Sequence, residues 1–482
     1  MKIMMIQLPH FYDDTERAPE YYPLGIGYLV SVLKQKHDMI PMDLWMAGAA
    51  VNDAVSLISK HDPDIYCISV YATQYPYFKE ITSVLKKRYP GKYIIAGGPA
   101  AASSYEILLK STGVDYCVIC EGERTMEELI DNLDHPENVN GIAYLNNDQA
   151  VLTPRRQVIN NLDELPFPDR DFYDFEKYMK NLARNNQYLK KSDRPANIIT
   201  GRGCPYKCTY CSKTFSGVRS RSVSSIIDEI SFLIQKYNIT AVFFNDELVI
   251  LNKKRTLNLC RRLEPLGIKW ICQGRINLMD EEILHSMKNA GCIAIGYGIE
   301  SYSQKILDNM KKQLRLEDIV PVIELTRNIG IEVIVQYMYG YPGEDDESIA
   351  ETEEFFEKID HLYVGSTATP LPGTELYQTA LDKGLIKDEE EYLCNLTMGY
   401  NPRILNGEYI DYPLVNLTDF SNDEFAVKKK KLRDRINSSY YSRHPVKKIL
   451  MILNRYIRIM KMFVYRPNIF WKKVYARLKN KF

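Results

Sequence analysis

The stretch GCPYKCTYC at residues 203–211 is the most informative part of the sequence. Its cysteines, Cys204, Cys208 and Cys211, have the spacing C-x3-C-x2-C and follow an apolar run at residues 197–200 that predicts a buried strand. Thiolates are soft ligands that suit iron–sulfur clusters or zinc. Three thiolates on one tight loop can hold three corners of a cubane [4Fe–4S] cluster and leave the fourth iron open to a small molecule.

Two other uses of these cysteines are weaker interpretations. A zinc site in such a loop would want a fourth protein ligand, and no histidine lies near the motif. A disulfide framework is not expected in a chain of 482 residues that begins with a strand-like run and no secretory signal. The spacing therefore favours a cluster.

At these residues the sequence resembles the radical S-adenosylmethionine (radical SAM) superfamily, whose motif has an aromatic residue before the last cysteine, here Tyr210. The resemblance implies that Cys204, Cys208 and Cys211 ligate a [4Fe–4S] cluster whose open iron binds S-adenosylmethionine. It also implies an electron donor of the flavodoxin or ferredoxin type, which would allow cleavage of the sulfonium to a 5′-deoxyadenosyl radical.

The N-terminal third alternates between predicted strands and helices. The strands are expected at residues 2–7, 39–43, 65–70, 93–96 and 116–119, and the helices at 24–36, 51–59, 77–89, 103–111 and 127–133. This rhythm predicts an α/β fold with a doubly wound parallel sheet of the Rossmann or flavodoxin type. Such sheets bind ligands at the carboxyl ends of their strands, where Ser69, Tyr71, the Gly97-Gly98 pair and Glu121 lie.

This domain resembles the cobalamin-binding domain that precedes many radical SAM domains. The family pattern D-x-H-x-x-G begins here at Asp43 and ends at Gly48, with Trp45 where the histidine would be. The later elements of the pattern correspond to Ser69-x-Tyr71 and Gly97-Gly98. The resemblance implies that Trp45, Ser69, Tyr71, Gly97, Gly98 and Glu121 contact cobalamin, as in radical SAM relatives that lack a lower protein ligand to cobalt. A degenerate domain that no longer binds cobalamin is the alternative.

Four segments are expected from these patterns: a cobalamin-binding domain at 1–137, a hairpin and linker at 138–190, a radical SAM core at 191–375, and a mainly helical, basic segment at 376–482. Six strand–helix units in the core predict a partial (β/α)6 barrel, the last strands being expected at 241–244, 269–273, 292–299, 332–338 and 363–368. Barrel active sites lie at the C-terminal ends of the strands.

Polar residues follow several of these strands. The resemblance implies that Asp246 and Glu247 contact the methionyl amine of S-adenosylmethionine, and Arg275 could pair with a carboxylate in a bidentate fork. Three further positions resemble family motifs: Glu300 and Ser301 for the ribose hydroxyls, and the segment starting at Tyr339-Gly340 for the adenine. The catalytic residues themselves are not identified.

The C-terminal segment is strongly basic. From Lys428 to the end there are eighteen Lys or Arg residues against one acid, Asp434, although the whole chain has 62 of each sign. The predicted helix at 446–465 could lie on an anionic membrane surface or cap the barrel with its apolar side. We favour the cap, and nucleic acid is a weaker option because nothing in the pattern specifies it. No run of about twenty apolar residues exists, so a cytoplasmic enzyme is expected, with membrane association left open.

The leading functional hypothesis is methylation of an unactivated carbon in a small-molecule or lipid-like substrate, with the methyl group passing through cobalamin. A radical SAM cyclase or rearranging enzyme is the first alternative. A non-catalytic cobalamin or redox sensor is the second.

Overall fold

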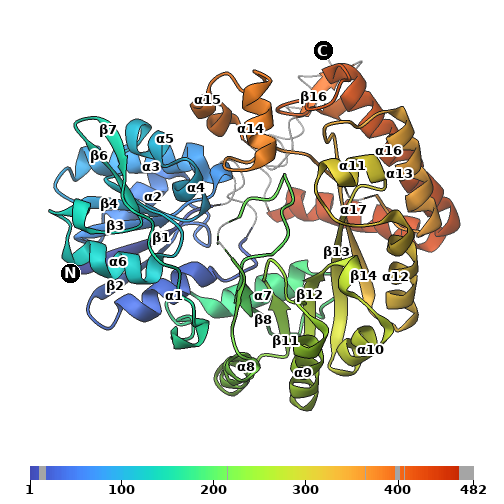
Figure 1. Ribbon diagram of the computed structural model, residues 1–482, viewed down its shortest axis with the longest axis horizontal. Coiled ribbons are helices and arrows are strands. Elements are labelled where there is room, and N and C mark those ends of the chain that lie inside the picture. Colours follow the sequence, from blue (N-terminus) through green and yellow to red (C-terminus); the bar gives the residue numbers. More distant parts are fainter. Residues whose placement is uncertain are drawn as a thin grey trace. The chain divides into compact units, whose positions relative to one another are not determined.

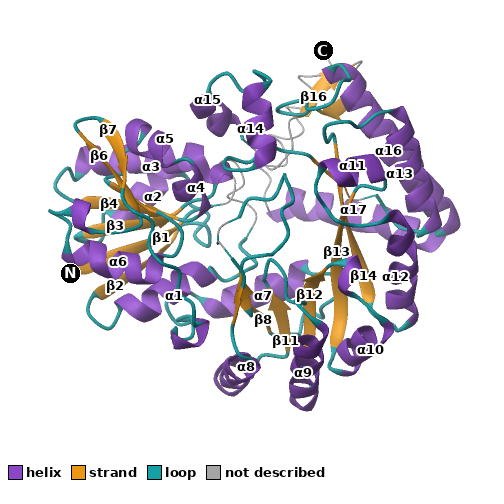
Figure 2. Cartoon of the chain, viewed as in Figure 1, coloured by secondary structure: helices purple, strands orange, loops and turns teal. Residues whose placement is uncertain are grey.

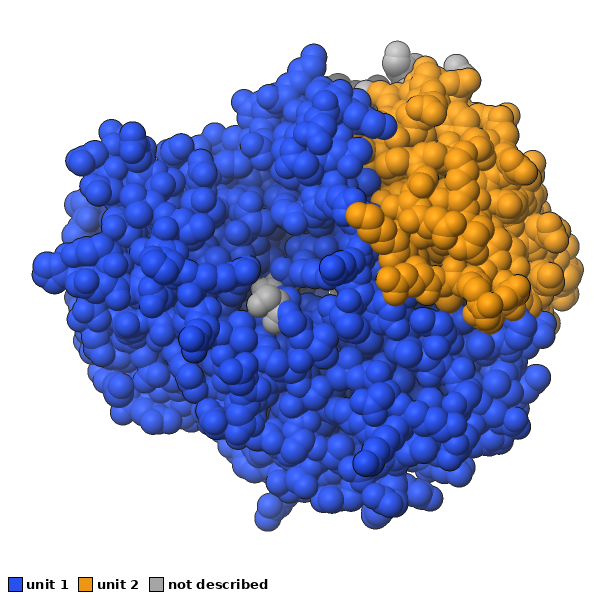
Figure 3. Space-filling view, in the orientation of Figure 1, with its two compact units in different colours: residues 1–298, 321–335, 370–398 blue, residues 299–320, 336–369, 399–482 orange. Residues whose placement is uncertain are grey.

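The computed structural model describes residues 1–9, 18–213, 215, 217–363, 365–396, 402–405 and 408–465. They fall into two compact units, shown in separate colours in Figure 3. Unit 1 comprises residues 1–298, 321–335 and 370–398, and unit 2 comprises residues 299–320, 336–369 and 399–482.

The N-terminal part of unit 1 is a seven-stranded sheet with the order β2-β1-β3-β4-β5-β6-β7. Its strands are β1 (Lys2–Gln7), β2 (Asp38–Asp43), β3 (Ile65–Ser69), β4 (Tyr93–Gly97), β5 (Tyr116–Val118), β6 (Ile142–Asn146) and β7 (Gln149–Leu152). The first five pair in parallel, and β1 is buried along all but its first residue. Near-continuous apolar strands of this kind are typical of parallel sheets covered on both faces.

Helices cover both faces of this sheet, which confirms the doubly wound fold (Figures 1 and 2). Helices α1 and α6 pack together, as do α2 and α3. The bounds are α1 (Leu24–Leu33), α2 (Val51–Ile58), α3 (Tyr75–Arg88), α4 (Pro99–Ser103), α5 (Tyr105–Ser111) and α6 (Gly122–Asp131).

The largest differences from the sequence-based expectation concern two helices and the hairpin. Helix α6 begins at Gly122, five residues before the expected start at 127. The helix expected at 103–111 begins at Tyr105 as α5, and an additional short helix, α4, precedes it; Ser104, with φ −139°, separates the two. The expected hairpin exists as β6 and β7, but it extends the parallel sheet: β6 pairs antiparallel with β5, in the register Cys117↔Ala143.

The linker belongs to unit 1, and the strands of the second sheet are divided between the two units. Helix α7 (Phe175–Asn185) begins at Asp174, whose side chain accepts a hydrogen bond from the Lys177 N–H. The second sheet has the order β15-β14-β13-β12-β11-β8, and the unit boundary falls within β13 and β14. Its strands are β8 (Pro195–Ile198), β11 (Ala241–Phe244), β12 (Lys269–Gly274), β13 (Cys292–Glu300), β14 (Glu332–Tyr339) and β15 (Gly365–Thr367). A short ladder joins β9 (Gly201–Arg202) to β10 (Arg219–Ser220).

The helices that follow these strands match the predicted strand–helix units of a partial barrel. They are α8 (Val223–Tyr237), α9 (Lys253–Leu263), α10 (Glu281–Asn289), α11 (Gln304–Asn309), α12 (Leu316–Asn328) and α13 (Asp346–Lys358). Two helices after the sixth strand, α14 (Glu375–Asp382) and α15 (Glu389–Asn395), belong to unit 1.

The C-terminal part of unit 2 is mainly helical. A small antiparallel pair, β16 (Pro402–Leu405) and β17 (Glu408–Asp411), precedes α16 (Asn422–Arg443) and α17 (Pro445–Tyr465). Ser421 and Glu424 form a capping box at the start of α16. In the described part of the chain, no helix is long and apolar enough to cross a membrane. The sequence also predicts a basic helix at 471–482, which lies outside the described residues.

Candidate cofactor site

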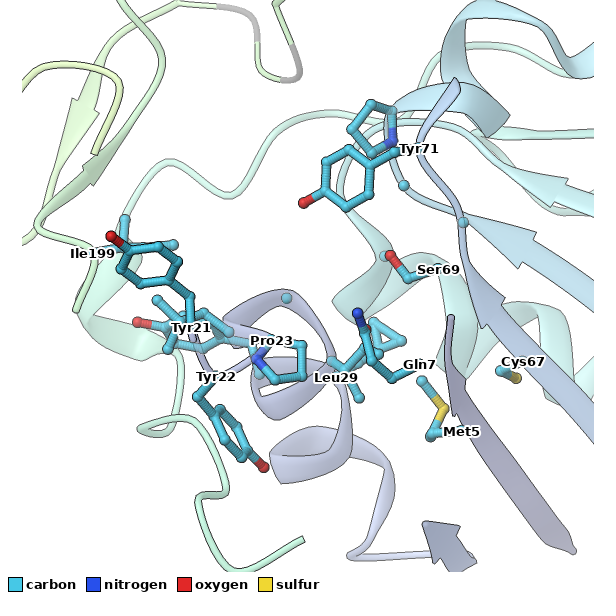
Figure 4. A pocket seen from close by; sticks show the side chains of 18 of the residues that line it. Met5, Gln7, Tyr21, Tyr22, Pro23, Leu29, Cys67, Ser69, Tyr71 and Ile199 are labelled. Carbon is cyan, nitrogen blue, oxygen red and sulfur yellow. The ribbon is translucent and has the colours of Figure 1, made fainter. Parts of the chain in front are cut away.

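A cavity of about 670 Å³ lies at the carboxyl ends of strands of unit 1. It opens between the ends of β3, β4 and β5 of the first sheet and the segments that follow β8 and β11 of the second (Figure 4). Seven of the residues predicted from the sequence line it: Trp45, Ser69, Tyr71, Gly97, Gly98, Glu121 and Glu247.

The glycine pair after β4 gives this cavity its open floor. Gly97 has no heavy atom within 4 Å of the position that a Cβ would take. Gly98 has φ +90°, and a Cβ there would come within 3.0 Å of both Ser69 Oγ and the Val70 carbonyl oxygen. Glycine is therefore required at 98 by conformation and close packing. At 97 the missing side chain leaves space for a ligand, which fits the cobalamin domain that the sequence indicates.

Aromatic side chains line opposite sides of the cavity. In Figure 4, Tyr71 and Ser69 lie on the side of the first sheet, and Tyr21 lies near Ile199 on the other side. Tyr71 is 44% exposed although it is large and apolar. Such rings offer flat apolar surface to a large ligand.

The structure places Trp45 in the lining, where the family pattern has a histidine. An indole has only an N–H donor and cannot coordinate a metal. The described residues that line the cavity include no histidine. The aspartate of the same pattern, Asp43, accepts hydrogen bonds from the Tyr178 hydroxyl (2.6 Å) and the Met46 N–H (2.8 Å). Burial raises the pKa of Asp43, and these two hydrogen bonds oppose the rise.

The two ends of the cysteine loop approach each other closely at Gly203 and Gly217. Gly203 has φ +86°, and a Cβ there would lie 1.8 Å from the Gly217 carbonyl oxygen. Only glycine permits this approach, so the position before the first cysteine is fixed by geometry. Next to this contact, Arg202 of β9 and Arg219 of β10 are partners in the antiparallel backbone ladder.

The three cysteines of the loop are accessible to different degrees. Cys204 and Cys208 are half-buried, Cys211 is exposed, and the Cys211 N–H donates to the Cys208 carbonyl (3.3 Å). Within the described ranges, no three His, Cys, Asp or Glu side chains are arranged to hold a metal ion. The fit to a [4Fe–4S] cluster thus rests on the donor set, which is three thiols on one loop.

A buried ion network joins the two ends of this loop to the first sheet. Arg202 Nη1 donates to Glu121 Oε1 (2.6 Å), and Arg219 Nη1 donates to both oxygens of the same carboxylate (2.8 and 3.0 Å). Arg202 Nη2 also donates to Glu123 Oε1 (2.5 Å). Arg202 and Glu121 are both buried.

The network sets the charge state of Glu121. Burial by itself would raise the pKa of this carboxyl group, but hydrogen bonds from Arg202, the Ile159 N–H and Arg219 bring the pKa below its ordinary value. Glu121 is therefore ionised, and its oxygens are engaged by protein donors. It lies in the cavity lining, but these contacts make it a residue that positions the loop.

Asp246 and Glu247, the two acids after β11, have different surroundings. Asp246 is buried, and its Oδ1 accepts from the Thr200 N–H (2.7 Å) and hydroxyl (2.9 Å). Burial raises the pKa of Asp246 to about 7. Asp246 thereby fixes the end of β8 to the end of β11, whereas Glu247 is exposed and lines the cavity. The sequence predicted both as ligand contacts, and the structure brings only Glu247 to the cavity.

Arg275 lies at the end of β12 and packs on the cysteine loop. Its guanidinium carbon is 3.4 Å from the centroid of the Tyr206 ring, which lies between the first two cysteines. Stacking of this kind is a cation–π contact. The predicted bidentate pairing with a carboxylate is not tested by this contact.

Four predicted residues belong to unit 2. Glu300 has φ +67°, and its carboxylate accepts from Lys312 Nζ (3.3 Å). Ser301 is buried, and its hydroxyl accepts from the Ser303 N–H (3.2 Å). The positive φ places Glu300 in the left-handed region, where a non-glycine residue is strained.

The Tyr339-Gly340 turn in unit 2 is built around a buried acid. Gly340 has φ +87°, and its N–H donates to Glu344 Oε2 (2.5 Å). Burial raises the pKa of Glu344 to about 8. Tyr339 is buried against Phe425, with ring centroids 4.9 Å apart. These contacts hold the turn in one conformation.

Sequence reasoning missed several residues of the site. Arg202 and Arg219 flank the motif, but their partner Glu121 lies 81 and 98 positions before them and gives no local signal. Tyr21 and Phe215 line the cavity without any recognisable pattern. One signal was present and overlooked: Cys117 and Cys120 also have the spacing C-x2-C. Cys117 is buried in β5, and Cys120 lies in the cavity lining with φ +68°.

Comparisons with known proteins agree with this architecture. The family model of the radical SAM superfamily matches residues 198–356, and the model of the B12 binding domain matches residues 14–130. An uncharacterized methyltransferase of Pyrococcus horikoshii is 30% identical over 435 residues, covering 88% of each chain. An anaerobic magnesium-protoporphyrin IX monomethyl ester cyclase of Rubrivivax gelatinosus is 26% identical, covering 87% of this chain and 77% of its own.

A solved structure has the same fold. It is a radical S-adenosylmethionine methyltransferase from Kitasatospora setae, determined with tryptophan and an S-adenosylmethionine analogue bound. The TM-score is 0.63 at 18% identity, and the match covers 80% of this chain and 77% of that one.

The fold and the cavity thus define an α/β enzyme with a B12-binding domain ahead of a radical SAM domain. The chain belongs to the cobalamin-dependent radical SAM enzymes. Its cofactors are a [4Fe–4S] cluster, S-adenosylmethionine and cobalamin.

Proposed function

We propose that this enzyme methylates an unactivated carbon of a small-molecule or lipid-like acceptor. The observation that supports this most is the shared cavity: strand ends of the B12-binding domain and of the radical SAM domain line the same space in unit 1. Reactants held in one site react as if at a very high local concentration, which a step using two cofactors requires.

The residues have distinct parts in this proposal. Cys204, Cys208 and Cys211 would hold the cluster, and the part of the cavity lined by Ser69 and Gly97 would hold cobalamin. When bound, the cluster with S-adenosylmethionine supplies a 5′-deoxyadenosyl radical, and cobalamin supplies the methyl group.

The chain itself orients these groups. Glu121 fixes both ends of the cysteine loop through Arg202 and Arg219, and Arg275 packs on its middle at Tyr206. Glu247 would bind the amine of S-adenosylmethionine. In unit 2, Glu300 and Ser301 would bind its ribose, and the segment that starts at Tyr339-Gly340 would contact its adenine. A flavodoxin or ferredoxin-type protein would deliver the electron.

The acceptor class is inferred from the lining. The cavity wall has many apolar side chains, with Tyr21, Tyr22, Leu29 and Phe215 among them. Such walls suit an organic molecule with apolar surface.

The test uses anaerobically reconstituted protein with cobalamin, a reductant and S-adenosylmethionine carrying a deuterated methyl group. Methylation predicts two products from S-adenosylmethionine, 5′-deoxyadenosine and S-adenosylhomocysteine, and a mass shift in an acceptor from a metabolite extract. Cys208→Ala should abolish 5′-deoxyadenosine. Cys260→Ala, a buried cysteine of α9 outside the motif, is the matched control and should retain it.

A cyclase is the second candidate, because a relative of similar coverage carries that name. It predicts 5′-deoxyadenosine with no S-adenosylhomocysteine and no transfer of the deuterated methyl group. That pattern would replace the methyl-transfer proposal.

A further inference from the structure

One face of helix α17 is apolar and exposed to solvent. Seven large side chains on it are between 50% and 67% exposed: Val446, Ile449, Leu450, Leu453, Tyr456, Ile457 and Met460. Relative to the first, they lie three, four, seven, ten, eleven and fourteen positions on. These intervals return to the same side of a helix with 3.6 residues per turn. The face is therefore continuous along the helix.

Helix α17 contacts α16 where the two helices join in unit 2. Met451 and Ile452, which lie off the apolar face, are also exposed (38% and 40%). Helices α16 and α17 pack together, and Lys447 Nζ donates to the Tyr440 hydroxyl (2.7 Å) while lying 5.3 Å from the ring centroid. Lys447 is off the apolar face by its register. A helix that capped the barrel with its apolar side would bury the seven residues, and they are exposed instead.

The charge of this segment has one sign. From Pro445 to the C-terminus the sequence has eleven Lys or Arg residues and no Asp or Glu. A broad apolar face combined with positive charge and no negative charge is typical of helices that lie in the plane of an anionic membrane surface. The apolar face enters the boundary between headgroups and acyl chains, and the cations contact anionic lipids.

A second copy of the chain fits this face less well. Helices that pair with each other use a narrow seam with charges of both signs on its flanks. Two copies of α17 would bring only positive charges together, and like charges in contact disfavour association.

We propose that α17 docks this enzyme on the surface of an anionic lipid bilayer. The inference rests on exposure, register and charge of α17, and it does not depend on methyl transfer.

Flotation with vesicles tests the proposal on the full chain with its cofactors. Vesicles of equal parts phosphatidylcholine and phosphatidylglycerol should carry about tenfold more protein than vesicles of phosphatidylcholine alone at 0.1 M salt. Binding should weaken in 1 M salt, where the screening length falls from about 10 Å to about 3 Å.

Two variants test whether vesicle binding depends on the apolar face of α17 or on any exposed apolar residue. The double variant Leu453→Glu with Ile457→Glu should lose about tenfold of the binding, because two carboxylates enter the apolar face. Leu152→Glu is the matched control: Leu152 lies on β7 and is 51% exposed, like Leu453. It should bind like the unmodified chain.

Three outcomes would overturn the proposal. They are absence of flotation with anionic vesicles, equal flotation of the double variant, and a concentration-dependent dimer in sedimentation that the double variant abolishes while no vesicle binding occurs. Circular dichroism of the double variant checks that α16 and α17 remain helical.

Discussion

Arg202 and Arg219 lie on opposite ends of the cysteine loop, and both donate hydrogen bonds to the carboxylate of Glu121. Glu121 follows β5 of the B12-binding domain, so one acid of that domain holds both ends of the loop for the cluster. This relationship predicts that changes at Glu121 affect the cluster although Glu121 is not a ligand.

The first prediction concerns this buried network. Glu121→Gln should lower the free energy of unfolding by about 3–5 kcal/mol, because Arg219 loses its carboxylate partner and Arg202 keeps only Glu123. Iron bound per chain after reconstitution should fall as well. Denaturant titration and iron analysis measure the two effects. The control is Arg124→Met, which removes an exposed pair with Glu164 (3.2 Å) and should cost about 0–1 kcal/mol. Equal effects of the two variants would contradict a special role for the network.

The second prediction concerns the glycine floor of the cavity. Gly97→Val should abolish cobalamin binding and leave the fold intact, because a Cβ at 97 meets no protein atom but enters the space for the ligand. Absorbance of bound hydroxocobalamin measures the loss, and thermal unfolding of the apoprotein checks the fold. Gly91→Val is the matched control, since Gly91 also has free space but lies far from the cavity in an exposed turn. Normal cobalamin binding by Gly97→Val would show that the ligand lies elsewhere.

The third prediction is a pH dependence from Glu344. Burial raises its folded-state pKa from 4.5 to about 8, so the folded chain binds the proton more tightly than the unfolded chain. Stability should therefore fall as the pH rises from about 4.5 to about 8 and level off above that. Glu344→Gln should remove this part of the slope, because glutamine has no charge to desolvate. Unfolding free energies at pH 5 and pH 8 test it, and an unchanged difference between these two values would contradict it.

Asp246 provides a fourth prediction: its contribution to stability also falls as the pH rises, but over a lower pH range than that of Glu344. Its pKa is raised from 3.8 to about 7 by burial, so its contribution falls between about pH 4 and pH 7. Asp246→Asn keeps an oxygen for Thr200 and should flatten stability over that range. Asp246→Leu loses the acceptor for two donors and should be less stable than Asp246→Asn at every pH. The reverse order would mean that Asp246 does not hold the ends of β8 and β11 together.

The fifth prediction concerns Arg275. Arg275→Met should weaken the binding of S-adenosylmethionine or reduce the change that S-adenosylmethionine causes in the cluster signal. The reason is that the side chain that packs on Tyr206 at the middle of the loop is lost. Arg275→Lys keeps a cation and should be intermediate, since an ammonium stacks less well than a planar guanidinium. Paramagnetic resonance with increasing S-adenosylmethionine separates the three proteins. Identical titrations would contradict the role.

The sequence predicted local features well and distant contacts poorly. The patterns at 2–7 and 51–59 give β1 and α2 with bounds that agree to within one residue, because apolar spacing is a local property. The break at Ser104 depends on one residue's backbone conformation, and the pairing of β6 with β5 depends on tertiary contacts. The shared carboxylate of Glu121 could not be predicted, because a buried ion network is defined only once distant segments meet. Likewise, Asp246 and Glu247 are neighbours in sequence, but Asp246 is buried and Glu247 is exposed. Both follow the end of β11, where the regular alternation of side chains between the two faces of a strand no longer predicts which one is buried.

The central claim is that one protein holds a cluster and cobalamin for a common reaction. The most direct test is anaerobic reconstitution followed by paramagnetic resonance and absorbance, with and without hydroxocobalamin. The protein should give a [4Fe–4S] signal that S-adenosylmethionine perturbs and should bind about one cobalamin per chain. A cluster that responds to S-adenosylmethionine in a protein that binds no cobalamin would contradict it, and methyl transfer through cobalamin would then have to be abandoned.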